Sequence, residues 1–290
     1  MKGKILKGGK NYGCRFDMKK RKKEWRWTVA ALIPTVIIIL PLYFIAIAGF
    51  QTVTEIFHRP PHLFPPNPTF AYYQNALLTL FPYMRNSIII AFGALALTLC
   101  VSLPSAFALA KFQFSLRKPV SFLLAFAQIL PATAVIIPLF LVFTRFDLIN
   151  NFLGVVLGVF VFTIPFATII LHAYMRSIPT GLMEAALIDG AGLLRIFWRI
   201  IIPLASPAIA TAGTLTLILA WGDFIFSLSF LKERTLQPMS IGLYHFIGQY
   251  GVRWNMLMAG SMIFAIPPLI VALIAGRAIV TGLTAGAFKE

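Results

Sequence analysis

The sequence alternates between long apolar stretches and short polar segments, and six of the apolar stretches are long enough to cross a membrane. A helix needs about 20 predominantly apolar residues to span a bilayer core. The six stretches run roughly over residues 28–50, 87–110, 120–143, 152–171, 204–230 and 257–276. This pattern predicts an all-α membrane protein with six transmembrane helices.

The segments around these stretches carry further structural signals. Five prolines between residues 60 and 68 exclude a regular helix there and favour extended chain. A short interfacial helix is expected over residues 72–85, with its aromatic rings at headgroup depth. In the fourth stretch, the four-residue spacing of Gly154 and Gly158 favours close helix packing over a specific dimer seam.

The composition supports a membrane protein. Of the 290 residues, 59% are hydrophobic and only 12% are charged, and the mean hydropathy is +0.85. A soluble domain carries about 25% charged residues, so lipid must be the solvent for most of this chain. The first apolar stretch is too long and too interrupted by proline for a signal-peptide core, and no small-residue cleavage site follows it, so we expect it to be retained.

The net charge of +16 would suit a nucleic-acid-binding protein, but its distribution indicates a membrane topology instead. Eleven of the 25 Lys and Arg residues precede Thr28. If the N-terminus is inside, 19 of the 25 fall in cytoplasmic segments, as expected because basic residues resist translocation. The pattern therefore predicts that both termini are cytoplasmic and that residues 1–27 form a basic tail, which can also touch anionic lipid.

The sequence lacks the residue sets of common catalytic and metal sites. Cys14 and Cys100 are expected in the tail and inside the second span, where a disulfide between them is implausible. His58 and His62 have no further ligand nearby except Glu55, so no metal site is expected. The 290 residues contain no G-x-x-x-x-G-K-[ST] phosphate loop and no H-E-x-x-H, and neighbouring predicted spans carry no Ser/His/Asp constellation. We therefore expect a chain that is not itself an enzyme and does not bind ATP by a phosphate loop.

The segment over residues 173–203 is charged and punctuated by glycine, although it lies between two apolar stretches. A short helix is expected over residues 181–188, and Asp189-Gly190 is a strong turn signal. A second helix is expected to follow, with one apolar face and one basic face: Leu194, Phe197, Ile201 and Leu204 against Arg195 and Arg199. On physical grounds this helix–turn–helix is either a docking surface or an interfacial connector with no partner.

The run Glu184-Ala-Ala-Leu-Ile-Asp-Gly-Ala, followed by Phe197, Ile200 and Pro203, resembles the EAA loop of bacterial ABC-importer permeases. In that family the loop docks into a cleft on a cytoplasmic ATPase subunit and carries the stroke of ATP binding to the bundle. The resemblance implies these docking positions: Glu184, Ala185, Ala186, Asp189, Gly190 and Ala191. Glu184 would meet a basic side chain of the ATPase, and Gly190 would permit the sharp turn.

Other segments resemble the maltose-type carbohydrate permeases, in particular their MalG-like half. These segments are Phe64-Pro-Pro-Asn-Pro-Thr, Asn86-Ser87, Ala220-Trp-Gly-Asp-Phe224 and residues 282–290. The resemblance implies that the C-terminal tail reaches the interface of the ATPase dimer through Leu283, Thr284, Ala285 and Gly286. Three features depart from the family pattern: Gly222 stands where a polar residue is frequent, Phe288 replaces a smaller residue, and the basic N-terminus is long.

Three residues in the predicted spans are candidates for the substrate path. Asp223 lies near the outer third of the predicted fifth span. It is a functional candidate because an ionisable group inside a membrane span is costly. Its side chain can also reach the water outside the membrane or pair with a partner helix. Trp221 can stack on a sugar ring or serve as an interfacial aromatic. Gln128 is the third candidate. Outside the spans, the aromatic-rich segment over residues 232–255 is expected to contact a binding protein through Tyr244, His245, Phe246 and Tyr250.

These features indicate the permease subunit of an ABC importer that carries a carbohydrate across the cytoplasmic membrane of a bacterium. Residues 28–281 would form the permease domain, with residues 173–203 as its coupling loop and residues 282–290 as a cytoplasmic tail. The resemblance implies a second homologous permease subunit, two ATPase subunits that hold ATP and Mg, and an extracytoplasmic sugar-binding protein. This chain itself would bind no cofactor, metal or nucleic acid.

Three alternatives to a carbohydrate importer stay open. The first is an ABC permease for another solute, such as a phosphorylated polyol, a peptide or an amino acid. The second is a stand-alone secondary transporter or channel, which would predict inverted repeats and several buried charges near the midplane. The third is a membrane enzyme. Within the carbohydrate interpretation, the cargo can be a neutral malto-oligosaccharide or an acidic uronate oligosaccharide.

Overall fold

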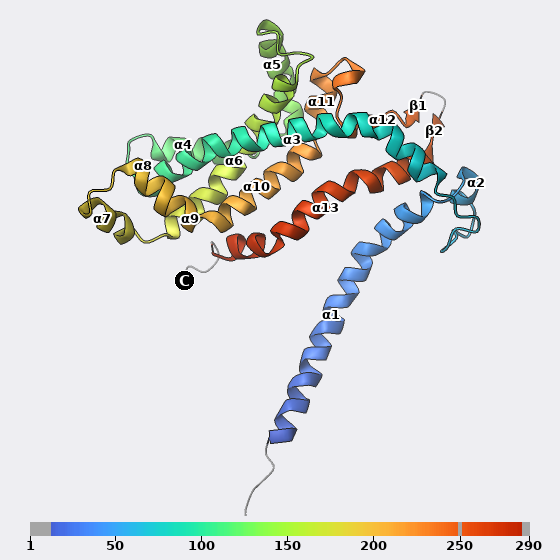
Figure 1. Cartoon of the computed structure of the whole chain (residues 1–290), viewed down its shortest axis with the longest axis horizontal. Coiled ribbons are helices and arrows are strands. Elements are labelled where there is room, and N and C mark those ends of the chain that lie inside the picture. Colours follow the sequence, from blue (N-terminus) through green and yellow to red (C-terminus); the bar gives the residue numbers. More distant parts are fainter. Residues whose placement is uncertain (1–12, 249–250, 286–290) are drawn as a thin grey trace, which may run out of the picture.

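The structure, a computed structural model, describes residues 13–248 and 251–285, which form a helical bundle (Figure 1). The longer helices are α1 (Gly13–Ala48), α3 (Ala71–Lys111), α4 (Arg117–Ala127), α5 (Ala132–Arg145), α6 (Phe152–Ser177), α10 (Ser206–Trp221) and α13 (Trp254–Ala285). The short helices are α2 (Val53–Ile56), α7 (Gly181–Ile188), α8 (Leu193–Ile196), α9 (Ile202–Leu204), α11 (Ile225–Phe230) and α12 (Met239–Tyr244). A π-helical turn, η1, covers Phe197–Ile201, and a 3₁₀ turn, η2, covers Arg234–Leu236.

Four of the described helices are long and apolar enough to cross a membrane. They are residues Val29–Ala48 of α1, all of α3 and α6, and Trp254–Gly276 of α13. Two further pairs meet the same condition if each pair is one bent span: α4 with α5, bent by 107°, and Leu193–Leu204 with α10, bent by 76°. By length and composition, the described chain therefore has four spans, or up to six if each bent pair is a single span.

The second predicted span differs from the expectation, because the interfacial helix over residues 72–85 is not separate from it. Helix α3 runs without interruption over 41 residues, which is about 60 Å at 1.5 Å per residue and about twice the thickness of a bilayer core. Asn86 and Ser87 lie inside this helix and are buried. The Asn86 amide donates hydrogen bonds to the carbonyls of Thr235 and Gln237 at 2.8 and 2.9 Å. The hydroxyl of Ser87 accepts a hydrogen bond from the N–H of Met239 at 2.8 Å. These two polar residues therefore fasten α3 to the segment over residues 232–255 rather than start a new helix.

The third and fifth predicted spans are both interrupted. The third is broken between α4 and α5, where Pro131 adopts extended backbone angles and has no N–H to continue the helix. The fifth was expected over residues 204–230, but α10 ends at Trp221, and α11 begins only at Ile225. Hydropathy reports that a stretch is apolar and is insensitive to such bends.

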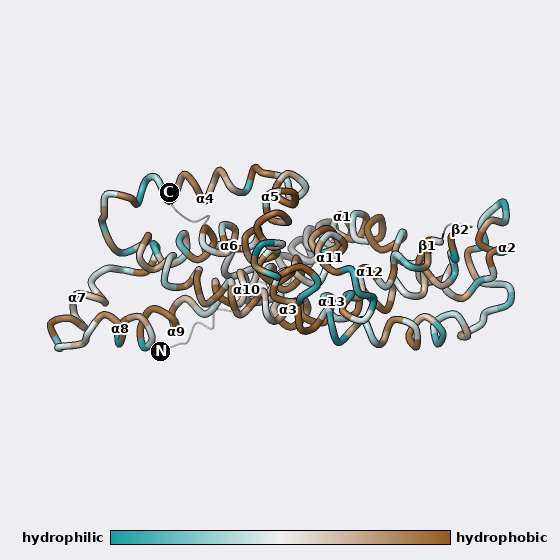
Figure 2. The backbone as a smooth tube through the Cα atoms, turned by 90° about the horizontal axis from the view of Figure 1, so that it is seen from above, coloured by the Kyte–Doolittle hydropathy of each residue, from teal (hydrophilic) through white to brown (hydrophobic). Residues whose placement is uncertain are grey.

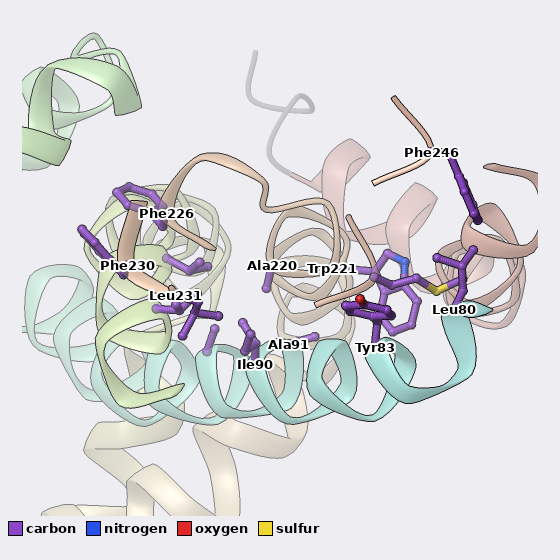
Figure 3. Close-up of a cluster of buried hydrophobic side chains, with 14 of the residues drawn as sticks. Leu80, Tyr83, Ile90, Ala91, Ala220, Trp221, Phe226, Phe230, Leu231 and Phe246 are labelled. Atoms are coloured by element: carbon purple, nitrogen blue, oxygen red, sulfur yellow. The ribbon is translucent and has the colours of Figure 1, made fainter. Parts of the chain in front are cut away.

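Buried side chains form two clusters. In the first core cluster, side chains from α3, α6, α10, α11 and α13 meet. Figure 3 shows Leu80 and Tyr83 of α3 near Trp221, with Phe226 and Phe230 of α11 at the other side of the cluster. The second core cluster joins α3, α6 and the segment from α7 to α10. Because it includes Met183, Ile196 and Ile201, the second core cluster holds the α7–α9 segment against α3 and α6. In Figure 1, α7 and α8 lie at one end of the bundle, and α2 with the β-ribbon lies at the opposite end.

Gly154 and Gly158 both face other parts of the same chain. A Cβ atom on Gly154 would lie 2.2 Å from the carbonyl oxygen of Leu148. One on Gly158 would lie 3.0 and 3.1 Å from the rings of Phe230 and Phe226. The predicted close packing at these glycines is confirmed, and its partners are the turn before α6 and helix α11.

Two local features complete the fold. A two-stranded antiparallel ribbon, β1 (Ile247–Gly248) with β2 (Gly251–Val252), is a small exception to the all-α prediction. Helix α1 extends away from the bundle, with residues 29–43 exposed (Figure 1). Figure 2 shows hydrophobic positions dominating the helices in the middle of the bundle and hydrophilic ones gathering mainly in the connecting segments.

Candidate functional site

Helix α7 and the turn that follows it carry the predicted docking residues at one end of the bundle (Figure 1). The structure confirms the helix predicted over residues 181–188 and the turn that follows it. Glu184 and Ala185 are exposed, whereas Ala186 is half-buried against the second core cluster. This geometry presents a carboxylate beside a narrow alanine surface to solvent.

The turn after α7 depends on Gly190, whose φ of +79° lies in the left-handed region that favours glycine. The N–H of Gly190 donates to the carbonyl of Leu187 at 3.0 Å, and the N–H of Ala191 donates to the carbonyl of Ala186 at 2.9 Å. These bonds satisfy carbonyls that the helix end would otherwise leave open. Asp189 is exposed at the turn, and Ala191 is half-buried below it.

The second helix of this segment differs from the prediction in which residues face the core. Phe197 and Ile201 are buried as expected, but Leu194 is 76% exposed and Leu204 is 44% exposed. The reason is the π-helical turn η1, in which the N–H of Ile202 bonds to the carbonyl of Phe197, five residues earlier. This wider turn shifts the helical phase of the residues that follow it, which moves Leu204 out of the buried face. Before the turn, Ile196 is buried instead of Leu194.

The α7–α9 segment is packed firmly onto the bundle. Met183 of α7 is buried, and Ile196 and Ile201 are fully buried in the second core cluster with residues of α3 and α6. The ring of Phe197 lies 5.2 Å from that of Phe107 on α3. A close-packed interface of this kind transmits displacement, because it leaves little free volume to absorb it.

Large apolar side chains of the α7–α9 segment are exposed, which was not predicted from the sequence. Ile188, Leu194 and Trp198 are 86%, 76% and 60% exposed. Large exposed apolar groups on a segment that also carries exposed charges are typical of a protein interaction surface. The sequence offered one indication of this exposure: Ile188 directly precedes the strong turn signal at Asp189-Gly190.

The substrate-path candidates occupy three different environments. Trp221 is 4% exposed, its indole N–H donates to the carbonyl of Phe264 at 3.1 Å, and its ring stacks on that of Phe264. In this arrangement no face of the indole is open to a sugar. Gln128 is exposed at the break between α4 and α5. Asp223 lies in the break between α10 and α11, and it lines a cavity of about 370 Å³.

The candidate contacts for a binding protein are also divided. Tyr244 is 46% exposed, and its ring packs edge-on against Phe224. Phe246 is only 1% exposed and belongs to the first core cluster, so the structure does not offer it as a surface contact. His245 is half-buried, and Tyr250 lies outside the described residues.

His245 makes the segment over residues 232–255 sensitive to pH. Burial, and then the charge of Arg234, lower the pKa of His245 below its ordinary value of 6.5. His245 therefore binds a proton more readily in the unfolded chain than in the folded one. The folded segment keeps its full stability above the pKa of the unfolded histidine and loses stability as the pH falls below it. We expect amide protection factors over residues 237–246 to fall between about pH 7 and pH 5. His245→Gln should remove that difference, and an equal fall in the variant would contradict the assignment.

The predicted contact of the C-terminal tail lies mostly beyond what the structure describes. Leu283, Thr284 and Ala285 end helix α13, and Gly286 lies outside the described residues. The contact with an ATPase interface therefore stays a prediction.

Comparison with known proteins gives consistent matches. The profile of the family described as "Binding-protein-dependent transport system inner membrane component" matches residues 99–286. The sulfoquinovosyl glycerol transport system permease protein SmoH of Agrobacterium fabrum is 30% identical over 263 residues, covering 90% of this chain and 92% of that protein. The trehalose/maltose transport system permease protein MalG of Thermococcus litoralis is 32% identical over 208 residues, covering 71% of this chain and 75% of that protein.

A solved structure shares the fold. A chain in the crystal structure of a bacterial ABC transporter involved in the import of the acidic polysaccharide alginate superposes with a TM-score of 0.75. The sequences are 24% identical, and the match covers 89% of this chain and 97% of that chain.

Proposed function

Because this chain belongs to the family of binding-protein-dependent transport system inner membrane components, we propose that it is the membrane-spanning permease subunit of an ATP-driven carbohydrate importer. The observation that carries this proposal is the surface of α7 at one end of the bundle, where Glu184 and Ala185 are exposed. An exposed docking surface packed onto the helices is what a subunit needs when its energy comes from another protein.

The proposed mechanism follows from the packing beneath α7. ATP-driven closure of an ATPase subunit would push α7, with Glu184 paired to a basic side chain of that subunit. Because Met183, Ile196 and Ile201 are packed against α3 and α6, the push would move these helices rather than deform the segment. The bundle would then open outward and accept the sugar from the binding protein.

The proposed assembly contains a second homologous permease subunit, two ATPase subunits that bind ATP and Mg, and an extracytoplasmic binding protein. The absence of a phosphate-binding loop from the 290 residues supports a separate ATPase. The bias of basic residues, 19 of 25 in the expected cytoplasmic segments, supports a location in the bacterial inner membrane with both termini inside.

A carbohydrate is the proposed cargo class. Two relatives that align with most of this chain are described as permease proteins of transport systems for sulfoquinovosyl glycerol and for trehalose/maltose. The compounds in these names are sugars or glycosides, which supports a carbohydrate over a peptide, an amino acid or a phosphorylated polyol.

The test is purification of the tagged chain from its native membrane and identification of the proteins that accompany it. We expect an ATPase subunit and a second permease in stoichiometric amounts, and ATP hydrolysis that rises when the binding protein is added. A chain that purifies without any ATPase would contradict the proposal.

A further inference from the structure

A cavity of about 250 Å³ lies between helices α3, α4 and α6. Its lining is mostly apolar and includes Leu109 of α3, Val120 and Leu124 of α4, and Ile164 of α6. In Figure 1, α4 lies beside α6 at the end of the bundle that carries α7 and α8. The cavity therefore belongs to the α7 side of the bundle, which is the cytoplasmic side in the proposed topology.

Two arginines lie at the cytoplasmic end of this cavity. Arg117 is the first residue of α4, and Arg176 lies in the last turn of α6. The charges of both arginines act on His172, so both guanidinium groups lie close to that ring. The imidazole of His172 donates a hydrogen bond to the carbonyl of Leu109, a residue of the cavity wall. The two charges are therefore gathered at the mouth of the cavity.

The helix faces that line the cavity lead directly to these charges. On α4, Arg117, Val120 and Leu124 follow one another at spacings of three and four residues. On α6, Ile164 and Arg176 are separated by three steps of four residues. Residues three or four apart are neighbours on one side of a helix. At 1.5 Å per residue the cavity walls extend about 10 to 18 Å from the arginines, a depth comparable to one leaflet of about 15 Å.

Nothing in the described part of the chain neutralises these arginines. Neither Arg117 nor Arg176 forms an ion pair with a carboxylate of a described residue. Nε2 of the half-buried His172 is also buried and has no hydrogen-bond partner among the described residues. Because the other ring nitrogen donates to Leu109, Nε2 is left as an acceptor. An occupant of this site therefore needs an apolar part, a negative charge and a hydroxyl group.

The surroundings of α4 supply such a molecule. Its outer face is apolar, with Phe122 and Leu123 72% and 64% exposed, which suits lipid as the solvent. Basic pockets between membrane helices on the cytoplasmic side bind anionic lipid headgroups. The planar guanidinium of arginine fits a phosphate through paired hydrogen bonds. The charge and the apolar wall thus match two ends of one lipid molecule.

We propose that this cavity binds an anionic phospholipid of the cytoplasmic leaflet. One acyl chain lies between α3, α4 and α6, the phosphate lies at Arg117 and Arg176, and a headgroup hydroxyl donates to Nε2 of His172. The site goes beyond the proposed transport function and uses only its topology. A lipid held there joins the start of α4 to the end of α6, next to the segment that carries α7.

The first test measures lipid binding to the complete purified transporter by native mass spectrometry. The delipidated complex is titrated in detergent with phosphatidylglycerol and with phosphatidylcholine of the same acyl chains. We expect the first phosphatidylglycerol to bind at least about tenfold more tightly, because two basic residues face its phosphate. Arg117→Gln combined with Arg176→Gln should reduce this affinity to that of phosphatidylcholine.

The control removes two exposed charges away from the cavity. Lys118→Gln changes the neighbour of Arg117, which lies about 100° further round α4, and Arg145→Gln changes the last residue of α5. This pair should leave the preference for phosphatidylglycerol unchanged. An equal loss in the control, or no loss in the Arg117 and Arg176 variant, would overturn the inference.

A second arm locates the acyl chain in the transporter without any substitution, so it decides the question even if a variant fails to assemble. Phosphatidylglycerol with a diazirine in the middle of one acyl chain is bound and irradiated, and the labelled peptides are mapped. We expect labels within residues 105–109, 120–124 or 164–168, which excess phosphatidylglycerol prevents and phosphatidylcholine does not. Labels confined to other lipid-facing helices such as α1 would overturn the inference, as expected if a second subunit fills the cavity.

ATP hydrolysis by the same complex separates this inference from the proposed function. If the binding protein stimulates hydrolysis but the complex shows no preference for phosphatidylglycerol, only the lipid site fails. If the complex lacks an ATPase but is labelled at the cavity, the proposed function fails and the lipid site stands.

Discussion

Glu184→Lys should lower ATP-driven uptake by at least about 100-fold, corresponding to a loss of about 3 kcal/mol in productive coupling. Glu184 is exposed on α7, and its side chain takes part in no described hydrogen bond, so reversing its charge should leave the bundle intact. If Glu184 meets a basic side chain of the ATPase subunit, as proposed, the change removes a favourable charge pair and introduces a like-charge contact, which costs several kcal/mol. Uptake by cells that express the whole transporter, with the amount of co-purified ATPase, measures the effect.

Two further variants show whether the effect belongs to the docking surface. Glu184→Gln removes the charge but keeps the shape, and it should reduce uptake by an intermediate amount. Lys118→Glu reverses an exposed charge at the start of α4, outside the coupling segment, and it should leave uptake unchanged. Normal uptake with Glu184→Lys, or an equal loss with Lys118→Glu, would show that α7 is not the docking element.

Local sequence signals predicted the α7 segment well. A helix over residues 181–188 and a turn at Asp189-Gly190 depend on residues next to one another in sequence, and both are present. The second helix was predicted less well, because a single π-helical turn alters which residues face the core. Leu194 and Leu204 have the right spacing for an ideal α-helix, and only the three-dimensional path shows that they are exposed.

The interruptions of the third and fifth spans were missed for a different reason. Hydropathy averages over a window and records only that a stretch is apolar, so it does not separate one straight helix from two bent ones. Pro131 and Gly222 were visible in the sequence, but proline and glycine also occur inside continuous membrane helices, as Pro82 does in α3. The breaks follow from what their residues contact, including the cap that Asp223 forms on α11.

Burial of aromatic residues is likewise a property of tertiary packing. Trp221 and Phe246 were candidates for contact with a sugar or a binding protein, yet both are buried in the first core cluster. Tyr244, with similar chemistry and only two residues from Phe246, is 46% exposed. Residue type alone does not separate these cases, because an aromatic ring suits a core and a binding surface equally.

The second large effect is expected for Gly154→Ala, which should destabilise the bundle by about 2–4 kcal/mol, as overpacking next to backbone does. The added Cβ would lie 2.2 Å from the carbonyl oxygen of Leu148, so the turn before α6 would have to move. Two hydrogen bonds of Asn150 hold that turn in place. The N–H of Asn150 donates to the carbonyl of Phe230 at 2.7 Å, and the side-chain oxygen of Asn150 accepts from the N–H of Glu233 at 2.9 Å. Displacement of the turn would therefore break the hydrogen bonds that Asn150 makes with Phe230 and Glu233. The yield of folded protein and its thermal aggregation temperature in detergent measure the loss.

Gly213→Ala is the matched control, since it makes the same change inside helix α10. A Cβ there would lie 3.4 Å from Leu95 and 3.6 Å from Leu99, which are ordinary contacts with side-chain carbons. Alanine is a better helix former than glycine by about 1 kcal/mol, so this variant should be as stable as the parent or slightly more stable. If both variants lost the same stability, the cause would be the loss of glycine in general. A loss confined to Gly154→Ala would instead locate the cause in the contact between α6 and the turn at Leu148, the contact that positions the N-terminal end of α6.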